Sequence, residues 1–207
     1  MSTESAQLAS PQPGGEDPAR VEAHDGPRFI VLVGLMGAGK TSLGKRLSKI
    51  FGLPFYDSDA EIEKAAGCTI AEIFERFGEA YFRDGERRVI ERILTSEPCV
   101  MATGGGSFMD ERIRTLIKER ALSIWLRADL DTLVKRTTKR RDDRPLLKNG
   151  DPREILNKLI EQRYPIYSEA DITIDVGDES PEKTSERVHR IILSHTNTAA
   201  DTCNGQT

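Results

Sequence analysis

Short apolar runs alternate with amphipathic stretches along most of the chain. The run FIVLV at residues 29–33 is continuous and rich in β-branched residues, which predicts a buried strand. The following stretch places Leu43, Leu47 and Ile50 at helical spacing and reaches Gly52, which predicts a helix that ends in a glycine cap. A strand followed directly by a helix is the first unit of an α/β fold.

The same alternation continues toward the C-terminus. Further strands are predicted at residues 54–56, 98–102, 121–126 and 171–176. Signals typical of helix N-termini occur at Thr69, Asp110, Asp151 and Ser180. Strands separated by helices imply an α/β fold with a mostly parallel sheet and right-handed crossovers.

The two ends of the chain lack this periodicity. Residues 1–27 mix Ser, Gly, Pro, Gln and acidic residues, and residues 196–207 are similarly polar. Because such segments cannot bury an apolar face, we predict a disordered tail at each end. The remaining residues, 28–195, have the length of one domain and show no internal repeat.

Composition narrows the class of protein. The 207 residues include 30 Lys and Arg against 34 Asp and Glu, a formal net charge of −4, which argues against a nucleic-acid partner. No apolar run is long enough to cross a bilayer, and the N-terminus lacks the basic-then-apolar order of a secretory signal. The three cysteines show no CxxC spacing, so neither a disulfide framework nor a structural zinc site is indicated. We therefore expect a cytoplasmic monomer with no membrane or nucleic-acid partner.

A glycine-rich segment, GLMGAGKT, follows the first predicted strand and opens the first predicted helix. It matches the pattern G-x-x-x-x-G-K-[ST], in which backbone N–H groups and a lysine hold nucleotide phosphates while a hydroxyl can bind Mg²⁺. The alternative is a glycine-rich turn without a ligand, which the strand-loop-helix context disfavours. The predicted nucleotide-binding residues here are Gly37, Ala38, Gly39, Lys40, Thr41 and Ser42.

Two acidic residues follow the second predicted strand. Asp57 and Asp59 in the segment YDSD lie at its C-terminal end, the edge at which open parallel sheets bind ligands. A period of two would point both carboxylates to one face, where one could serve a metal ion and the other a substrate hydroxyl. The alternative is that Asp59 only caps a helix at residues 60–66.

The segment TGGG at residues 103–106 follows the third predicted strand. Glycines have no side chain beyond hydrogen, so a backbone of this kind can approach a small ligand closely. The alternative is a flexible loop without a ligand.

Arginines are the remaining candidates for binding. Arg83 lies in YFRDGE, Arg163 lies in QRYPIY, and Arg136 precedes the basic run TTKRRDDRPLL, which contains Arg144. Each could be a solvated surface charge. However, a short basic loop between two predicted helices is suited to cover nucleotide phosphates.

Six segments occur in an order that resembles the shikimate kinase family: GLMGAGKT, YDSD, FRDGE, TGGG, DDRPLL and RYPIYSEA. The resemblance spans about residues 28–193. It implies the nucleoside monophosphate kinase fold, a three-layer sandwich around a five-stranded parallel sheet, with a substrate-binding segment at about 57–95 and a lid at about 137–150. The implied reaction transfers the γ-phosphoryl group of ATP to the 3-hydroxyl of shikimate, with Mg²⁺ as the metal, on the route to chorismate and the aromatic amino acids.

On the nucleotide side, the resemblance assigns Thr41 and Asp57 to Mg²⁺ and makes Lys40, Asp59 and Arg144 the catalytic residues. Arg144 would be the lid arginine that reaches the phosphates. The pair that flanks adenine would be Arg136 and Pro181.

On the substrate side, the resemblance implies that Glu86 orients Arg83 from one helical turn away. The family more often has Thr in place of Ser58, a difference that matters little if Ser58 faces away from the site. Two planar guanidinium groups suit the single carboxylate of shikimate, and an aspartate suits its hydroxyls. The residues implied to hold shikimate are Asp59, Arg83, Gly104, Gly105, Gly106 and Arg163.

Three other functions are considered. A kinase of the same fold could act on another small metabolite, such as gluconate or a nucleoside monophosphate. The paired arginines argue against a neutral substrate but not against every sugar acid. A GTPase-type switch is disfavoured because the sequence contains no DxxG segment. An inactive homologue would be expected to lack Lys40 or Asp59, and both are present.

Overall fold

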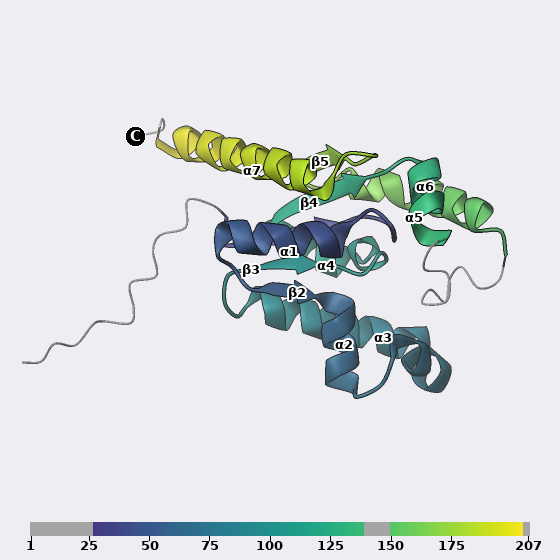
Figure 1. Ribbon diagram of the computed structural model, residues 1–207. Helices are drawn as coiled ribbons and strands as arrows, with labels where there is room; N and C mark the ends of the chain where they lie inside the picture. The colour runs from purple at the N-terminus through teal and green to yellow at the C-terminus, as the bar shows by residue number, and fades with distance from the viewer. Residues whose placement is uncertain (1–26, 139–149, 205–207) are drawn as a thin grey trace, which may run out of the picture.

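Five strands in the described part of the chain form one parallel sheet at the centre of the protein (Figure 1). This computed structural model describes residues 27–138 and 150–204. The strands lie in the order β2-β3-β1-β4-β5, and every neighbouring pair is parallel. Their bounds are Phe29–Val33 for β1, Phe55–Asp57 for β2, Cys99–Ala102 for β3, Leu122–Arg127 for β4 and Ile172–Asp175 for β5. The predicted five-stranded parallel sheet is therefore confirmed, and each strand end lies within one residue of its predicted position.

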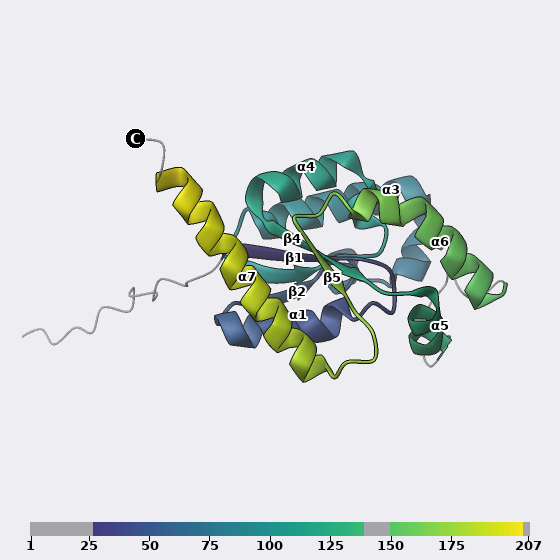
Figure 2. The same ribbon diagram turned by 90° about the horizontal axis from the view of Figure 1, so that it is seen from above.

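Helices cover both faces of this sheet. Figure 2 shows α1 and α7 on one face and α3 and α4 on the other, so the three-layer arrangement is also confirmed. The bounds are Lys40–Phe51 for α1, Ser58–Ala66 for α2, Ile70–Leu94 for α3, Glu111–Arg120 for α4, Leu130–Thr138 for α5, Pro152–Tyr167 for α6 and Pro181–Asn204 for α7; a short 3₁₀ turn, η1, spans Ser107–Met109.

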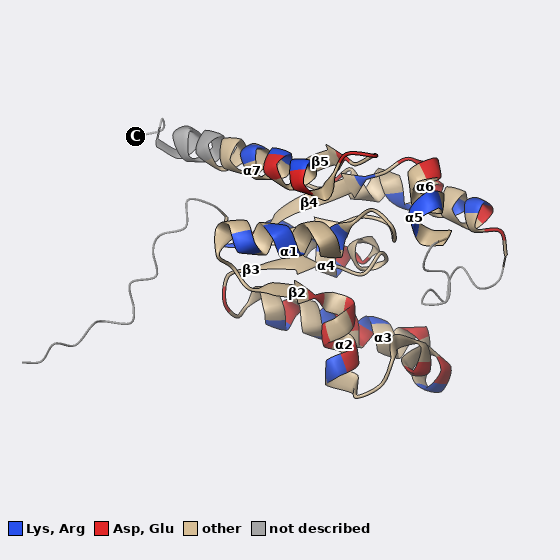
Figure 3. Ribbon diagram, in the orientation of Figure 1, with Lys and Arg blue, Asp and Glu red and all other residues tan. Residues whose placement is uncertain are grey.

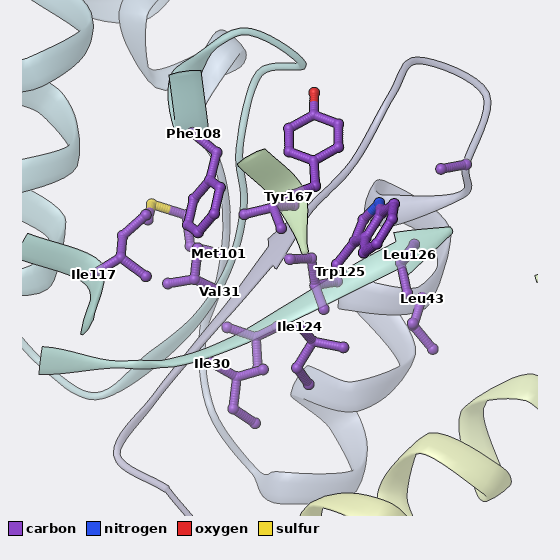
Figure 4. Packing of buried hydrophobic residues seen from close by; sticks show 14 of the residues in the cluster. Ile30, Val31, Leu43, Met101, Phe108, Ile117, Ile124, Trp125, Leu126 and Tyr167 are labelled. Carbon is purple, nitrogen blue, oxygen red and sulfur yellow. The ribbon is translucent and has the colours of Figure 1, made fainter. Parts of the chain in front are cut away.

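The central strand explains why its sequence is continuously apolar. Residues 30–33 of β1 are fully buried because the strand has a neighbour on each side and a helical layer on each face. Figure 4 shows Phe108, Met101 and Ile117 close to Val31 on one side of the sheet. These four residues belong to one continuous hydrophobic core.

The face of α1 that packs on the sheet differs from the predicted one. Leu43 and Leu47 are buried as expected, but Ile50 is 41% exposed and Phe51 is buried instead. Gly44 accounts for this, because a Cβ atom at that position would lie only 2.4 Å from the Phe55 ring. The face of α1 that contains Gly44 therefore packs against the sheet, and this face includes Phe51 rather than Ile50.

The helix ends agree with most of the predicted cap signals. Thr69 and Glu72 form a capping box at α3, while Asp110 and Asp151 cap α4 and α6. At the C-terminal end the prediction was wrong, because α7 continues to Asn204 rather than stopping before residue 196. The predicted N-terminal tail lies outside the described residues except for Pro27. None of the helices in residues 27–138 and 150–204 is both long enough and apolar enough to span a bilayer.

Charged residues are concentrated on the helices, whereas the strands are largely free of them. In Figure 3, acidic and basic residues lie next to one another along α3 and α7. Because the sheet is parallel, the carboxyl ends of all its strands meet at one edge, where the segments that follow β1, β2 and β3 come together. These are the three segments in which the sequence predicts a binding site.

Candidate active site

The loop between β1 and α1 has the backbone of a phosphate-binding loop. Gly37 and Gly39 have φ values of 86° and 100°, which side-chain-bearing residues rarely adopt. Gly39 is also the N-cap of α1 and gives its helix no side-chain cap bond, so the first backbone N–H groups of α1 can bind an anion. The Lys40 ammonium folds back along this loop and donates to the carbonyl oxygens of Gly34 at 2.7 Å and Leu35 at 3.1 Å.

Asp57 connects this loop to the second strand. Its Oδ2 atom accepts a hydrogen bond of 2.8 Å from the Thr41 hydroxyl, and its Oδ1 atom accepts from the backbone N–H of Asp59 at 3.2 Å. The N-cap of α2 is therefore Asp57, and the alternative in which Asp59 caps this helix is wrong. The helix begins two residues earlier than that alternative required.

Asp59 lies in the first turn of α2, so the two acids do not share one strand as a period of two suggested. The Asp59 carboxyl group is largely desolvated. Burial, together with the neighbouring Asp57, raises its pKa to about 6, although the positive charge of Lys40 acts in the opposite direction. This electrostatic coupling indicates that the Asp59 carboxylate lies near the phosphate-binding loop.

Each of the three glycines after β3 lies against one of the predicted substrate-binding residues. A Cβ atom on Gly104 would be 2.5 Å from Asp59 Oδ1, and one on Gly105 would be 3.4 Å from Arg163 Nη1. A Cβ atom on Gly106 would be 2.9 Å from Arg83 Nη1. The segment is therefore not a free flexible loop: its lack of side chains allows one carboxylate and two guanidinium groups to gather around it.

The two arginines are held by different partners. Arg83 donates to the buried Glu86 carboxylate at 2.7 Å, as expected, and more weakly to Glu79. Arg163 donates to the carbonyl oxygen of Gly105 at 2.7 Å. The Tyr167 hydroxyl, one helical turn further along α6, donates to the same oxygen, and burial raises the pKa of Tyr167 to about 12, so the phenol stays a donor.

Three contributors were not predicted from the sequence. Tyr167 was missed although its i,i+4 spacing from Arg163 was a usable signal. Ser58 does not face away, because it is fully buried and accepts a hydrogen bond of 2.9 Å from the Gly104 backbone N–H. Ser107 is also fully buried and donates to Glu86 at 2.6 Å.

Arg136 lies beside the phosphate-binding loop. Its guanidinium donates to the Gly177 carbonyl at 2.5 Å and reaches the Gly37 carbonyl at 3.4 Å, so it links the segment before α7 to the phosphate-binding loop. Pro181 is exposed and is the first residue of α7. The next residue, Glu182, forms an ion pair of 2.6 Å with Arg46 of α1. Arg144 and most of the predicted lid lie outside the described residues.

Taken together, these groups form two adjoining half-sites. One offers backbone N–H groups and Lys40 to phosphates, and the other offers two guanidinium groups and the Asp59 carboxylate to a small hydroxylated anion. In the described residues, no group of three or more His, Cys, Asp and Glu side chains could hold a metal ion by itself. Mg²⁺ usually takes only one or two protein ligands and completes its coordination with waters and phosphate oxygens, so a smaller set of side chains is enough for it.

Comparison with known proteins gives a consistent answer. The family model described as shikimate kinase matches residues 36–193. A shikimate kinase from Paramagnetospirillum magneticum is 57% identical over 168 residues, which are 81% of this chain and 86% of that protein. The structure of shikimate kinase from Acinetobacter baumannii in complex with shikimate is 36% identical, with a TM-score of 0.80, and the match covers 84% of this chain and 97% of that one.

A gluconokinase from Sinorhizobium meliloti is more distant, at 19% identity and a TM-score of 0.53 over 89% of this chain and 98% of that one, so the likeness extends to the fold alone. The matched family model begins at Met36, inside the segment that follows β1, and covers the segments after β2 and β3 and most of the folded core. The chain belongs to the shikimate kinase family.

Proposed function

We propose that this protein transfers the γ-phosphoryl group of ATP to the 3-hydroxyl group of shikimate, giving shikimate 3-phosphate and ADP. The observation that best supports this is the gathering of Asp59, Arg83 and Arg163 around the three glycines after β3, beside a phosphate-binding loop. Shikimate has one carboxylate and three hydroxyls, so its carboxylate suits the two guanidinium groups and its hydroxyls suit the Asp59 carboxylate.

In this proposal, Arg83 and Arg163 bind the shikimate carboxylate through charge-assisted hydrogen bonds. Glu86 keeps the Arg83 guanidinium in place, and Tyr167 keeps the Gly105 carbonyl paired while Arg163 engages the substrate. Backbone atoms of Gly104, Gly105 and Gly106 lie against the ring because no side chain separates them from it.

Asp59 orients the 3-hydroxyl group and accepts its proton as the oxygen attacks the γ-phosphorus. An anionic carboxylate is needed for this, and a pKa of about 6 leaves Asp59 ionised at neutral pH while keeping it more basic than an exposed aspartate. Lys40 and the first N–H groups of α1 stabilise the negative charge on the transferred group and on the leaving ADP. Arg144 would add a further positive charge from the lid.

Thr41 and Asp57 are suited to hold Mg²⁺. Two neighbouring ligands of an octahedral magnesium ion are roughly 3 Å apart, and Thr41 Oγ1 and Asp57 Oδ2 are 2.8 Å apart. When bound, the ion would neutralise charge on the β- and γ-phosphates.

Several features stay predictions within this proposal. These are the substrate-binding segment at about 57–95, the lid at about 137–150, the stacking of adenine between Arg136 and Pro181, and the cytoplasmic, monomeric state. The contact of Arg136 with Gly177 supports the adenine assignment, because it brings the chain before Pro181 toward the phosphate-binding loop.

The test is ADP release measured with shikimate, gluconate and AMP as separate acceptors at saturating ATP. We expect turnover with shikimate and none above the ATPase background with the other two. Turnover with gluconate or AMP and none with shikimate would contradict the proposal and would favour the alternative of a kinase for another small metabolite.

A further inference from the structure

Glu86 is a buried carboxylate behind the substrate-binding groups. It is 1% exposed, and its Oε2 atom accepts the hydrogen bond from Arg83. A buried charge is costly unless its hydrogen-bonding atoms are satisfied, so the position of this carboxylate depends on a donor for its second oxygen as well. That donor is the Ser107 hydroxyl, 2.6 Å from Oε1.

Ser107 is the first residue of η1, directly after the three glycines, and is fully buried. Its hydroxyl has one proton and two acceptors in reach, the Glu86 carboxylate at 2.6 Å and the Gly104 carbonyl at 3.1 Å. Because a bond to a charged oxygen is shorter and stronger than one to a neutral carbonyl, the proton goes to Glu86. The carboxylate is therefore held from both sides, by Ser107 and by Arg83.

The other contacts of the Arg83 guanidinium are weaker, among them one with the Phe82 ring, whose centroid lies 5.1 Å from Cζ. Its second partner, Glu79, is 67% exposed and lies 3.3 Å away, which describes a weak surface ion pair. Gly106 lies close to the guanidinium, since a Cβ atom on this residue would be 2.9 Å from Nη1. Glycine has no side chain, however, and so offers Arg83 no attractive contact. The direction of Arg83 therefore depends mainly on Glu86, and Glu86 depends on Ser107.

We infer that Ser107 is a positioning residue for the substrate carboxylate, acting through Glu86 on Arg83 without touching the substrate itself. This inference rests on the proposed function. Removing the hydroxyl leaves Glu86 Oε1 buried without the hydrogen-bond donor that Ser107 supplies, so the carboxylate moves and Arg83 moves with it. Arg83 binds a part of shikimate that does not react. Displacing Arg83 therefore weakens the binding of the substrate and of the transition state equally, which raises KM without lowering kcat.

The experiment compares the parent protein with Ser107→Ala under steady-state conditions. We expect the KM for shikimate to rise about ten-fold, the effect of losing one hydrogen bond to a charged group, while kcat and the KM for ATP change less than about two-fold. Ser123→Ala is the matched control. Ser123 is also fully buried and donates to a carboxylate, Asp171, at 2.6 Å, but it lies near the amino end of β4, so its loss should lower stability and leave both KM values unchanged.

A second comparison separates positioning from general weakening of the core. In an Arg83→Ala background, adding Ser107→Ala should cause no further rise in the KM for shikimate, because the hydroxyl acts through Arg83. The same rise in both backgrounds would overturn the inference. Ser107→Cys keeps nearly the same volume with a weak donor, so it should reproduce the defect if the alanine variant does not fold.

The outcomes also separate this inference from the proposed function. A parent protein without shikimate turnover would contradict the function, whereas an active parent with an unchanged KM in Ser107→Ala would overturn only the role of Ser107. Failure of both the alanine and the cysteine variants to fold would likewise overturn it, because the hydroxyl would then be a requirement of folding.

Discussion

Asp59 and Gly104 lie so close that any side chain on the glycine would displace the carboxylate, since a Cβ atom there would be 2.5 Å from Asp59 Oδ1. The same atom would also be 3.2 Å from Ser107 Oγ and 3.3 Å from Glu86 Oε1. The small size of residue 104 therefore sets the position of the proposed base, although the two residues are far apart in the sequence and belong to different strand ends.

The first prediction is that Gly104→Ala lowers kcat about 100-fold, because a displacement of about 1 Å at a reacting group has an effect of that order. ATP binding should stay close to that of the parent, since Gly104 lies on the substrate side. The measurement is kcat at saturating shikimate and ATP, with a calorimetric titration of ATP.

Gly85→Ala is the control for this prediction. A Cβ atom on Gly85 would meet nothing within 4 Å, and the residue lies inside α3, so alanine should raise stability by up to about 1 kcal/mol and leave kcat unchanged. A full-activity Gly104→Ala variant would show that the tight contact with Asp59 has no bearing on the reaction.

Asp59→Asn should lower kcat by about 10² to 10⁴, since the amide cannot accept the hydroxyl proton. Loss of a helix cap would not explain this decrease in kcat, because Asp57 and not Asp59 caps α2. Turnover at saturating substrates is the measurement. Parental turnover in this variant would exclude Asp59 from the chemistry.

The same substitution should change stability in a pH-dependent way. Burial raises the pKa of Asp59 from 3.8 to about 6 in the folded state, so ionising it opposes folding. Well above pH 6, Asp59→Asn should therefore have the larger free energy of unfolding, by about 3 kcal/mol, and this gain should shrink as the pH falls from 6 toward 4. Urea unfolding of both proteins across this range tests it; a constant difference would mean that Asp59 has an ordinary pKa.

On the nucleotide side, Arg136→Ala should raise the KM for ATP about ten-fold and leave the KM for shikimate unchanged, because it removes the link from Gly177 to the phosphate-binding loop. Arg153→Ala is a suitable control, since Arg153 forms an exposed ion pair with Asp131 of α5, the helix that carries Arg136. An equal effect on both KM values would mean that Arg136 supports the fold as a whole and has no specific role in ATP binding.

The sequence predicted those parts of the site that depend on local patterns. A continuous apolar run followed by glycines and Lys40 requires a buried strand, a tight loop and a helix N-terminus, and the structure has all three. The family resemblance likewise implied the contact between Arg83 and Glu86, which lie three residues apart on α3 and form an ion pair of 2.7 Å.

The errors arise where a tertiary contact decides the outcome. The cap of α2 depends on where β2 ends, and a shift of two residues transfers the role from Asp59 to Asp57. The contact between Ser107 and Glu86 joins residues 21 positions apart, so no local period could indicate it. Ile50 is exposed because Gly44 brings α1 close to Phe55, which only the packed structure defines.

The most direct test of the central claim is the identity of the product formed from ATP and shikimate. Phosphorus NMR of the reaction mixture, with correlation to the ring protons, identifies the hydroxyl that carries the phosphate. We predict a single phosphate ester at the 3-hydroxyl, formed in equal amount to ADP, and formed at least about 100-fold more slowly by Asp59→Asn. ADP and free phosphate without any phosphorylated shikimate, or an ester at another hydroxyl, would contradict the account.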